Sequence, residues 1–518
     1  MPLVSMTSLG GCLKSSDQKI AFRVDVSLSI GTGHLMRCLT LADELKQRGA
    51  HSRFISRHML GHLRDMLATK GHEFKLLDSI RNAVVPGDLA HAEWLGVTQE
   101  SDAQDTIHAL SDQTWDWLVV DHYALDAHWE SALRSTARKI MVIDDLADRQ
   151  HDCDVLLDQN FYTDMDTRYS GKVPSYCRLL LGPQYALLRV EFCQLREQIK
   201  PRSGPAKSIL VFFGGVDADN YTGRVIEALS EITTSGLHVD VVIGAQHPYR
   251  EQIKEASAQH GFICHIQTDK MAELMAAADL AIGAGGSATW ERCCLGLPAL
   301  VFCTADNQQK QIADAAQKGF LYTPEINTDL AAVIKNHTTA LLENGHLRRL
   351  ISLKAMQAVD GRGVSRIIGN LGCSGIEMRM ANADDSAKLF EWRNHPRIRS
   401  VSRNTEPITW EEHKKWFASV MDSKSRVLLI GQSDKSPIGV VRFDKQEEEA
   451  EVSIYLVPDA NHSGQGRNLL LSAEQWIKDK RPDIKCIRAS VLGSNKHSQR
   501  LFLGAYYQVD VTHYVKQF

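Results

Sequence analysis

The stretch Gly31-Thr32-Gly33-His34-Leu35-Met36-Arg37 follows a short apolar run that begins at Ile20. Near the other end of the chain, Asn461-His462-Ser463-Gly464-Gln465-Gly466-Arg467 also follows a strand-like run. Each stretch predicts a glycine-rich turn that leads from a strand into a helix. Such a turn directs backbone N–H groups and the positive end of a helix dipole toward whatever binds in front of it. The sequence therefore predicts two nucleotide-handling catalytic modules, one with a histidine at its turn and one with an arginine.

The size and composition of the chain exclude several classes of protein. At 518 residues the chain has room for roughly three or four domains. A net charge of -4 gives no sign of a nucleic-acid or membrane surface, and no stretch approaches the roughly 20 apolar residues of a membrane helix. Its 11 scattered cysteines show no zinc-ligand spacing and indicate reduced thiols. We therefore expect a cytoplasmic protein that binds no metal, nucleic acid or membrane; its oligomeric state is left open.

Patterns of apolar residues divide the chain into a flexible leader over residues 1–19 and three larger units. Between 20 and 200, buried runs end on aspartates, as parallel strands do when their carboxyl ends open toward a site. After a linker that contains Pro, Gly and Ser, a second series of strand and helix patterns covers 205–370. Residues 376–518 begin with helix patterns and continue with strand patterns. The sequence predicts two Rossmann-like α/β domains followed by an α+β domain.

Several motifs within residues 20–370 resemble those of one enzyme family. They lie at 31–38, 121–123, 143–149, 157–160, 182–189, 214–217, 283–291 and 307–308. In this order they resemble the UDP-sugar hydrolase of pseudaminic acid biosynthesis, which cleaves UDP-2,4-diacetamido-2,4,6-trideoxy-β-L-altropyranose. That family has the two-domain GT-B arrangement of MurG-type glycosyltransferases. The resemblance implies the same fold and activity for this part of the chain.

His34 is the expected base of such a hydrolysis. Cleavage at the anomeric carbon needs a positioned water, a group that takes its proton, and compensation for the charge of the departing diphosphate. An imidazole titrates near neutral pH, and a helix start disfavours its protonated form. The resemblance assigns the corresponding histidine to water activation. A capping or packing role is the alternative, but the flanking glycines, including Gly33, favour function.

The charged side chains near this histidine could have either functional or structural roles. Arg37 lies one helical turn further on and is expected either to contact substrate or to pair with a carboxylate such as Asp25. Asp144, Asp145 and Asp148 are expected to cap helices and orient basic side chains rather than to hold a metal.

Three polar side chains are candidates for substrate contacts. Tyr123 is expected at a strand end, where its hydroxyl would bond the sugar or the attacking water, or else its ring would pack the domain edge. Asn160 and Tyr185 are weaker candidates for contacts with the sugar.

The second domain carries the expected UDP site. Gly285-Gly286-Ser287 begins a helix, and small residues there allow the backbone to approach a phosphate while the serine adds a hydroxyl donor. Glu291 lies one turn further on and is placed to accept from ribose hydroxyls, as a glutamate does in the MurG-like group. Asn307 and Gln308 follow the next strand pattern, where the family contacts its ligand.

Residues 376–518 resemble the GNAT acetyltransferases, including the N-acetyltransferase of the same pathway. The resemblance rests on Trp392-Arg393-Asn394, on the strand pattern at 451–456 and on the glycine turn that follows it. In the family this strand diverges from its neighbour, and amides of the turn hold the pyrophosphate of acetyl-CoA. The residues implied in acetyl-CoA binding are Leu456, Gly464, Gln465, Gly466, Arg467, Asn468 and, at the pantetheine, Asn495. Asn461 departs from the first position of the family's turn signature.

The proton donor of this domain is uncertain from the sequence. Many relatives place a tyrosine at the position of Phe502 to protonate the departing thiolate, and phenylalanine has no proton to give. Tyr506 and Tyr507 are candidates to replace it. Glu451 or Glu449 is a candidate base for the sugar ammonium, although both could be solvated surface charges.

The two resemblances imply consecutive steps: N-acetylation of a UDP-linked 4-amino sugar with acetyl-CoA as co-substrate, then hydrolysis to UDP and the free diacetamido sugar. Two alternatives remain open. The first is a GT-B UDP-sugar glycosyltransferase with an accessory GNAT domain, because one fold supports both reactions. The second is a hydrolase whose GNAT-like domain is a catalytically silent binding module, for which Phe502 is the reason.

Overall fold

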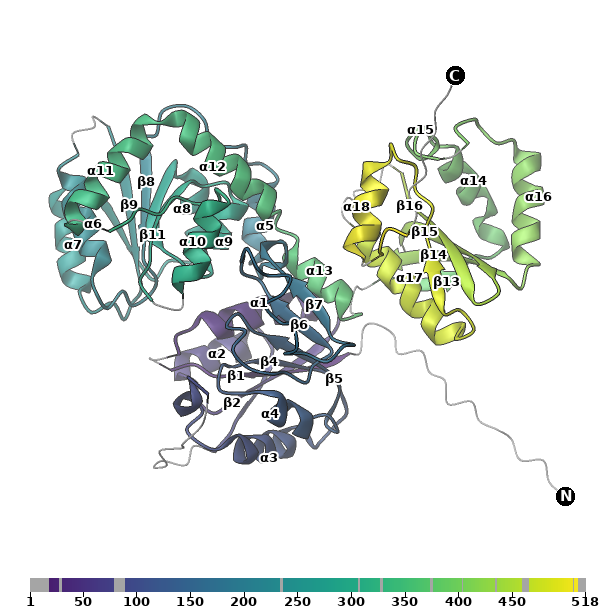
Figure 1. Ribbon diagram of the computed structural model, residues 1–518, viewed down its shortest axis with the longest axis horizontal. Helices are drawn as coiled ribbons and strands as arrows, with labels where there is room; N and C mark the ends of the chain where they lie inside the picture. The colour runs from purple at the N-terminus through teal and green to yellow at the C-terminus, as the bar shows by residue number, and fades with distance from the viewer. Residues whose placement is uncertain are drawn as a thin grey trace. The chain divides into compact units, whose positions relative to one another are not determined.

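A computed structural model describes residues 18–27, 30–78, 89–232, 236–305, 308–326, 329–372, 376–402, 404–433, 436–458, 465–505 and 507–510. The expected leader over residues 1–19 falls almost entirely outside these ranges. One compact unit holds Lys19–Glu44 and Ser52–Val364, and a second contains Ser365–Phe518. Figure 1 shows the helices and strands of each. Among the described residues, no helix is both long and apolar enough to cross a membrane.

The first sheet has the strand order β3-β2-β1-β4-β5-β6-β7. Its strands are β1 (Lys19–Val24), β2 (His51–Ser56), β3 (Glu73–Leu76), β4 (Trp115–Asp121), β5 (Ala137–Ile143), β6 (Val155–Asp158) and β7 (Arg178–Leu181). The pairs β1–β4, β4–β5, β5–β6 and β6–β7 are parallel, so their carboxyl ends share one edge. The helices are α1 (Gly33–Gln47), α2 (Gly61–Thr69), α3 (Gln99–Leu110), α4 (Ala127–Ala132) and α5 (Val190–Arg196), with short 3-10 turns η2 (Ala92–Trp94) and η3 (Pro183–Tyr185).

The second sheet repeats this parallel pattern with five strands in the order β10-β9-β8-β11-β12. They are β8 (Ser208–Phe212), β9 (His238–Ile243), β10 (Ile263–Ile266), β11 (Leu280–Ala284) and β12 (Ala299–Phe302). The helices are α6 (Tyr221–Ser230), α7 (Arg250–Gln259), α8 (Met271–Ala277), α9 (Ala288–Cys294), α10 (Gln309–Gln317), α11 (Leu330–Glu343) and α12 (Gly345–Ala358), and α13 (Gly363–Asn370) contains the boundary between the two units. Two apolar clusters cover the two faces, one with α6, α7 and α11 and the other with α8, α9 and α10, which explains why its strands are apolar on both faces.

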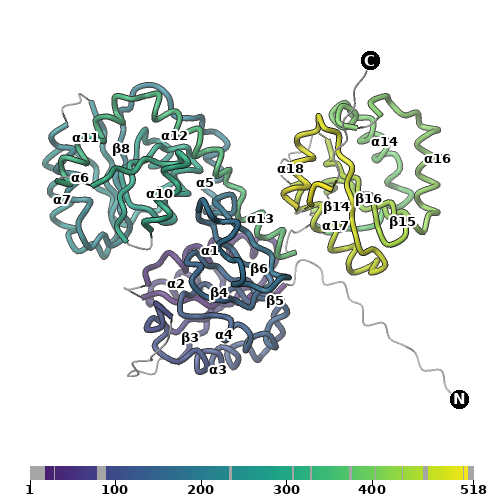
Figure 2. Tube along the Cα trace, viewed as in Figure 1, coloured from purple at the N-terminus to yellow at the C-terminus, as the bar shows by residue number. Residues whose placement is uncertain are grey.

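The third sheet is mixed, with the order β13-β14-β15-β16-β17. Its strands are β13 (Glu377–Met380), β14 (Arg426–Ser433), β15 (Ser436–Gln446), β16 (Glu449–Leu456) and β17 (Cys486–Arg488), and its helices are α14 (Ser386–Asn394), α15 (Pro396–Arg399), α16 (Trp410–Met421), α17 (Gly466–Lys480) and α18 (Lys496–Gly504). Alternating residues pack α17 and α18 on one face and α14 and α16 on the other (Figure 2). β13 to β16 pair antiparallel, whereas β16 and β17 are parallel. Two parallel-sheet Rossmann-like domains followed by a mixed-sheet α+β domain confirm the fold class predicted from the sequence.

Buried charges support the loops at the carboxyl edge of the first sheet. His151 is 3% exposed, and its Nδ1 lies 2.8 Å from Oε1 of Glu130 while its Nε2 lies 3.8 Å from Oδ2 of Asp144. Burial alone would lower the pKa of His151, but the neighbouring carboxylates of Asp144 and Glu130 raise that pKa to about 9. The histidine is therefore a buried cation at neutral pH, held between two carboxylates.

We expect His151→Gln to remove part of the pH dependence of stability. The pKa of His151 is raised from 6.5 to about 9, so its stabilisation is complete below about pH 6.5 and is lost as the pH rises through 9. The shift corresponds to about 3 kcal/mol at most. Urea unfolding near pH 6 and near pH 10 should show a smaller loss of stability in the variant than in the wild type. His128→Gln is the control because that side chain is 90% exposed; an equal pH dependence in all three proteins would contradict the expectation.

Candidate functional site

His34 pairs with a buried carboxylate at the end of a central strand. It is the second residue of α1, and its Nδ1 lies 2.6 Å from Oδ1 of Asp121, the last residue of β4. A carboxylate only accepts hydrogen bonds, so Nδ1 carries the ring proton and the Nε2 lone pair stays available. This arrangement of base and carboxylate suits abstraction of a proton from a bound water.

Arg37 pairs with a carboxylate, as one of its two expected roles required, but with Asp121 rather than Asp25; its contact with substrate stays a prediction. Its Nε donates to Oδ2 of Asp121 at 2.6 Å and its Nη2 donates to Oδ1 at 2.7 Å, and Nη1 lies 3.3 Å from Oδ2 of Asp145. Asp25 is already bound by two nitrogens of Arg23 from its own strand. Burial alone would raise the pKa of Asp121, but the charge of Arg37 and the hydrogen bonds from Arg37 and His34 hold that pKa well below its usual value. Asp121 therefore stays ionised.

Tyr123 lies beside the histidine with its hydroxyl fixed. Its Oη donates to Oδ1 of Asp145 at 2.5 Å, and its ring meets the His34 ring edge-on at 4.7 Å between centroids. Burial, followed by the charge of Asp145, raises the pKa of Tyr123 well above its usual value. The phenol is thus a neutral hydrogen-bond donor at the wall of the candidate site.

Two aromatic residues at this site were missed by the sequence analysis. The Trp94 ring of η2 stacks on Tyr123 at 5.7 Å between centroids, and the His91 ring lies 4.4 Å from Trp94 and 5.4 Å from Tyr123. Trp94 also meets His34 edge-on at 6.5 Å. This segment contains no glycine turn and follows no predicted strand, so the amino-acid sequence alone does not indicate that it belongs to a site.

Asn160 ties the first half of this unit to the second. Its Nδ2 donates to Oδ2 of Asp145 at 3.1 Å, and its Oδ1 accepts from Nε1 of Trp290 at 2.8 Å and from Nε2 of Gln311 at 3.0 Å. The amide thus joins the loop after β6 to α9 and α10. Tyr185, in η3, is only 5% exposed. Both residues keep their sugar-contact role as a prediction only.

Asp145 accepts from Tyr123, Arg37 and Asn160, while Asp144 and Asp148 both pair with Arg149. These aspartates orient neighbouring side chains, in line with the interpretation of the sequence. Within the described part of the chain, no three His, Cys, Asp or Glu side chains are grouped so that they could hold a metal ion.

The glycine turn before α9 leaves little room for larger residues. A Cβ on Gly285 would lie 2.8 Å from Cδ1 of Ile312 and 2.9 Å from Oε1 of Gln308, and Gly286 has a φ of +80°. Ser287 precedes α9 without capping it through its side chain. Among the described residues, Oε1 of Gln308 is buried without a hydrogen-bond partner, so it is available to a ligand. Asn307 lies outside the described residues.

Glu291 lies on α9, one turn after the glycines. Its side chain is 18% exposed, and Oε1 lies 3.6 Å from Nη2 of Arg189. Burial raises the pKa of Glu291 even though Arg189 opposes the shift. A half-buried carboxylate with one loose ion pair has lone pairs left for hydroxyl donors.

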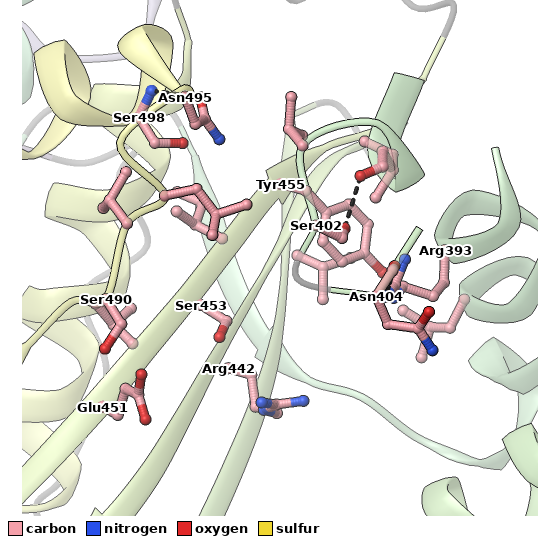
Figure 3. Close-up of a pocket in the computed structure, with 18 of the residues that line it drawn as sticks. Arg393, Ser402, Asn404, Arg442, Glu451, Ser453, Tyr455, Ser490, Asn495 and Ser498 are labelled. Carbon is pink, nitrogen blue, oxygen red and sulfur yellow. Dashed lines mark hydrogen bonds between the residues drawn. The ribbon is translucent and has the colours of Figure 1, made fainter. Parts of the chain in front are cut away.

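The third sheet opens beside a cavity. β16 pairs with β17 only over Glu449–Glu451, and the rest of β16 diverges from the segment that follows β17. A cavity of about 680 Å³ lies there. Figure 3 shows its polar lining, which includes Arg393, Arg442, Glu451, Ser453, Tyr455, Ser490, Asn495 and Ser498. One cavity thus reaches from α14 and α16 to α18.

The cavity holds polar atoms without partners. His413 is 1% exposed, and among the described residues its Nδ1 and Nη1 of Arg393 have no hydrogen-bond partner. Glu451 and Tyr455 lie on the same face of β16 and both line the cavity, and burial raises the pKa of Tyr455. His413 and its free Nδ1 were not singled out in the sequence.

No tyrosine hydroxyl among the described candidates is placed to replace the missing one at Phe502, which lines the cavity. Tyr507 donates to Oε1 of Glu474 at 2.9 Å, and burial raises its pKa. Tyr506 lies outside the described residues. Glu449 is held by Arg488 at 2.8 Å, and Glu451 is the candidate base that lines the cavity.

The expected acetyl-CoA turn is described only in part. Gly464 lies outside the described residues, Gln465 precedes α17, and Gly466, Arg467 and Asn468 form its first turn, where N–H groups lack partners within the helix. The Asn468 side chain packs at Gly369, so only its backbone faces the turn. Leu456 ends β16, and Oδ1 of Asn495 caps α18 by accepting from Ser498 N at 3.0 Å.

Two family models match the chain. Residues 208–339 match the glycosyltransferase family 28 C-terminal domain, and residues 376–504 match the acetyltransferase (GNAT) domain. An uncharacterized protein of Methanocaldococcus jannaschii is 24% identical over 506 residues, which cover 93% of this chain and 95% of that protein.

Two relatives of stated activity match separate parts. The UDP-2,4-diacetamido-2,4,6-trideoxy-beta-L-altropyranose hydrolase of Campylobacter jejuni is 25% identical over 304 residues, 58% of this chain and 97% of that enzyme. The acetyltransferase PseH of the same species is 34% identical over 86 residues, 16% of this chain and 54% of that enzyme. The chain thus joins a GT-B glycosyltransferase-like part similar to that hydrolase to a GNAT domain similar to PseH, which confirms the two resemblances.

Proposed function

We propose that this chain is a bifunctional nucleotide-sugar enzyme of pseudaminic acid biosynthesis, with domains at 20–200, 205–370 and 376–518. The first two domains hydrolyse UDP-2,4-diacetamido-2,4,6-trideoxy-β-L-altropyranose to UDP and the free sugar. The third acetylates the 4-amino precursor with acetyl-CoA. The similarity to the hydrolase over nearly its whole length, and to PseH in the third domain, supports both assignments.

The pairing of His34 with Asp121 carries the hydrolase proposal. Nε2 of His34 takes a proton from water as that water attacks the anomeric carbon, the anomeric C–O bond breaks, and UDP leaves with the electron pair. Asp121 holds the tautomer and stabilises the imidazolium that forms. Because Arg37 keeps Asp121 ionised, this support persists at neutral pH. Tyr123 donates its only hydroxyl proton to Asp145, so beside the reacting water it holds that carboxylate in place and lines the site.

UDP is assigned to the second domain. The glycine turn at 285–286 lets phosphate oxygens approach backbone N–H groups, and Ser287 adds a hydroxyl donor. Glu291 accepts from the ribose, and Gln308 offers its unpartnered oxygen beside the turn. The match of this domain to the glycosyltransferase family 28 model supports a nucleotide site here.

The cavity in the third domain suits acetyl transfer. The amine of the sugar attacks the thioester carbonyl, the C–S bond breaks, and the amine proton and the thiolate are the two charges to be handled. Glu451 is assigned as the base, acting through water. Arg393 and His413 offer unpartnered atoms to the acceptor. The backbone at 465–468 and Asn495 are assigned to acetyl-CoA.

We expect His34→Ala to slow UDP release by about 100- to 10,000-fold, because a lost general base costs about that much. UDP affinity should stay within about twofold because the nucleotide is held by the other domain. Turnover is measured as UDP release, and the free sugar is identified by mass spectrometry. His128→Ala, a change of a 90% exposed histidine, is the control. Unchanged turnover would remove His34 from the mechanism, and UDP release only when an acceptor alcohol is added would favour a glycosyltransferase.

For Glu291→Ala we expect UDP affinity, rather than turnover, to change. Loss of a charged hydrogen bond to ribose should weaken UDP binding by about 10- to 100-fold while saturated turnover changes little. Calorimetric titration with UDP measures the affinity. Glu251→Ala, on α7 and 66% exposed, provides the control. Equal affinity in the variant and the wild type would place the ribose elsewhere.

Acetyl transfer is tested with the full chain carrying His34→Ala, so that the acetylated product is not consumed. With acetyl-CoA and a UDP-4-amino-4,6-dideoxy sugar, we expect mass spectrometry to detect the acetylated sugar and a thiol assay to detect CoA. Glu451→Gln should slow the reaction by about 100-fold, and Phe502→Tyr should speed it by supplying an acid. Tyr507→Phe is the control because its hydroxyl is bound to Glu474. Acetyl-CoA binding without product would indicate a silent module.

A further inference from the structure

The side of the candidate hydrolase site next to His34 is a wall of aromatic rings formed by His91, Trp94 and Tyr123. Centroid distances of 4.4, 5.4 and 5.7 Å link the three rings to one another. His34 meets two of them edge-on, Tyr123 at 4.7 Å and Trp94 at 6.5 Å. We call these three residues the aromatic wall.

Two polar groups at this wall are directed into the protein. The Tyr123 hydroxyl donates to Asp145, and Nδ1 of His34 is held by Asp121. Tyr123 is only 8% exposed, whereas Trp94 and His91 are half-buried. Trp94 is the largest ring of the wall that keeps exposed surface, so it offers mainly an apolar face to whatever lies beside His34.

We infer that Trp94 is a specificity-determining residue that selects sugars rich in methyl groups over hydroxylated ones. The inference rests on the proposed function of the first two domains. A water activated by His34 must attack the anomeric carbon, so the sugar ring lies next to His34 and within reach of the wall. Aromatic faces bind C–H and methyl groups and leave hydroxyl groups without partners.

The chemistry of the proposed substrate fits such a wall. A 2,4-diacetamido-2,4,6-trideoxy sugar carries three methyl groups, two on its acetamido groups and one at C6. UDP-N-acetylglucosamine has one methyl group and carries hydroxyls at C4 and C6. Burial of one methyl group favours binding by about fourfold, so contacts with two further methyl groups favour the trideoxy sugar by about 10- to 20-fold.

The test measures binding in a chain that carries His34→Ala, so that no ligand is consumed during the titration. Calorimetry is done with UDP, UDP-N-acetylglucosamine and UDP-2,4-diacetamido-2,4,6-trideoxy-β-L-altropyranose. Trp94→Ala should weaken binding of the trideoxy sugar nucleotide by about 10-fold or more, UDP-N-acetylglucosamine by about fourfold or less, and UDP by less than about twofold. Trp94→Phe keeps a ring and should retain most of the preference. Trp410→Ala, which alters a tryptophan 36% exposed in the third domain, should change none of the three affinities.

Each outcome decides for or against the inference. An unfolding midpoint in urea equal to that of the parent chain shows that the first domain of the Trp94→Ala variant is folded. An equal loss for both sugar nucleotides, or no loss for either, would overturn selection by Trp94. UDP release by the chain with His34 intact is measured separately. A chain that binds the trideoxy sugar through Trp94 but releases no UDP would refute the proposed hydrolysis and keep the inference, whereas hydrolysis without any Trp94 effect would do the reverse.

Discussion

The ionised carboxylate of Asp121 is the constraint on which the candidate hydrolase site depends. It ends β4, a central strand, and receives His34 and Arg37 from one face of α1. The two residues are three positions apart, so the helix brings both to the same strand end. Without the arginine, burial would favour the protonated acid, and a protonated Asp121 would no longer fix the histidine tautomer. The tautomer of the proposed base and the charge of its partner thus follow from one parallel strand that ends opposite one helix start.

The sequence predicted most of this fold because its signals are local. Apolar runs that end on aspartates indicate parallel strands, and the glycine turns indicate where helices begin. The partner of Arg37 could not be predicted in this way. Three carboxylates follow neighbouring strands, and the sequence does not show which of them another arginine already binds. Asp25 is held by Arg23 and by Ser56 of the next strand, which leaves Asp121 for Arg37. Trp94 approaches His34 only through the tertiary fold, so no spacing in the sequence could reveal it.

Asn160 has a structural role that its place in the sequence did not indicate. Its position after β6 marked it as a candidate for substrate contact, whereas its amide joins Asp145 to Trp290 and Gln311 across 130 and 151 residues of sequence. All three bonds are satisfied by the protein. An amide suits this position because it donates to a carboxylate on one side and accepts from two N–H groups on the other. An aspartate there would repel Asp145, and a leucine would remove the acceptor of the Trp290 and Gln311 N–H groups.

The two proposed reactions differ in how much help the nucleophile needs from the protein to lose its proton. Water is a poor nucleophile at neutral pH, so hydrolysis at an anomeric carbon calls for a base whose tautomer and charge are fixed by buried partners, as at His34. An amine that has lost its proton attacks a thioester readily, and the thiol is a good leaving group, so an exposed glutamate such as Glu451 can suffice. The same reasoning explains how an acetyltransferase can work with Phe502 at this position. The departing thiol has a pKa of about 8.5, close enough to neutral pH that water can protonate the thiolate. Solvent can replace a missing acid there, whereas without a base beside the anomeric carbon the attacking water keeps its proton and remains a weak nucleophile.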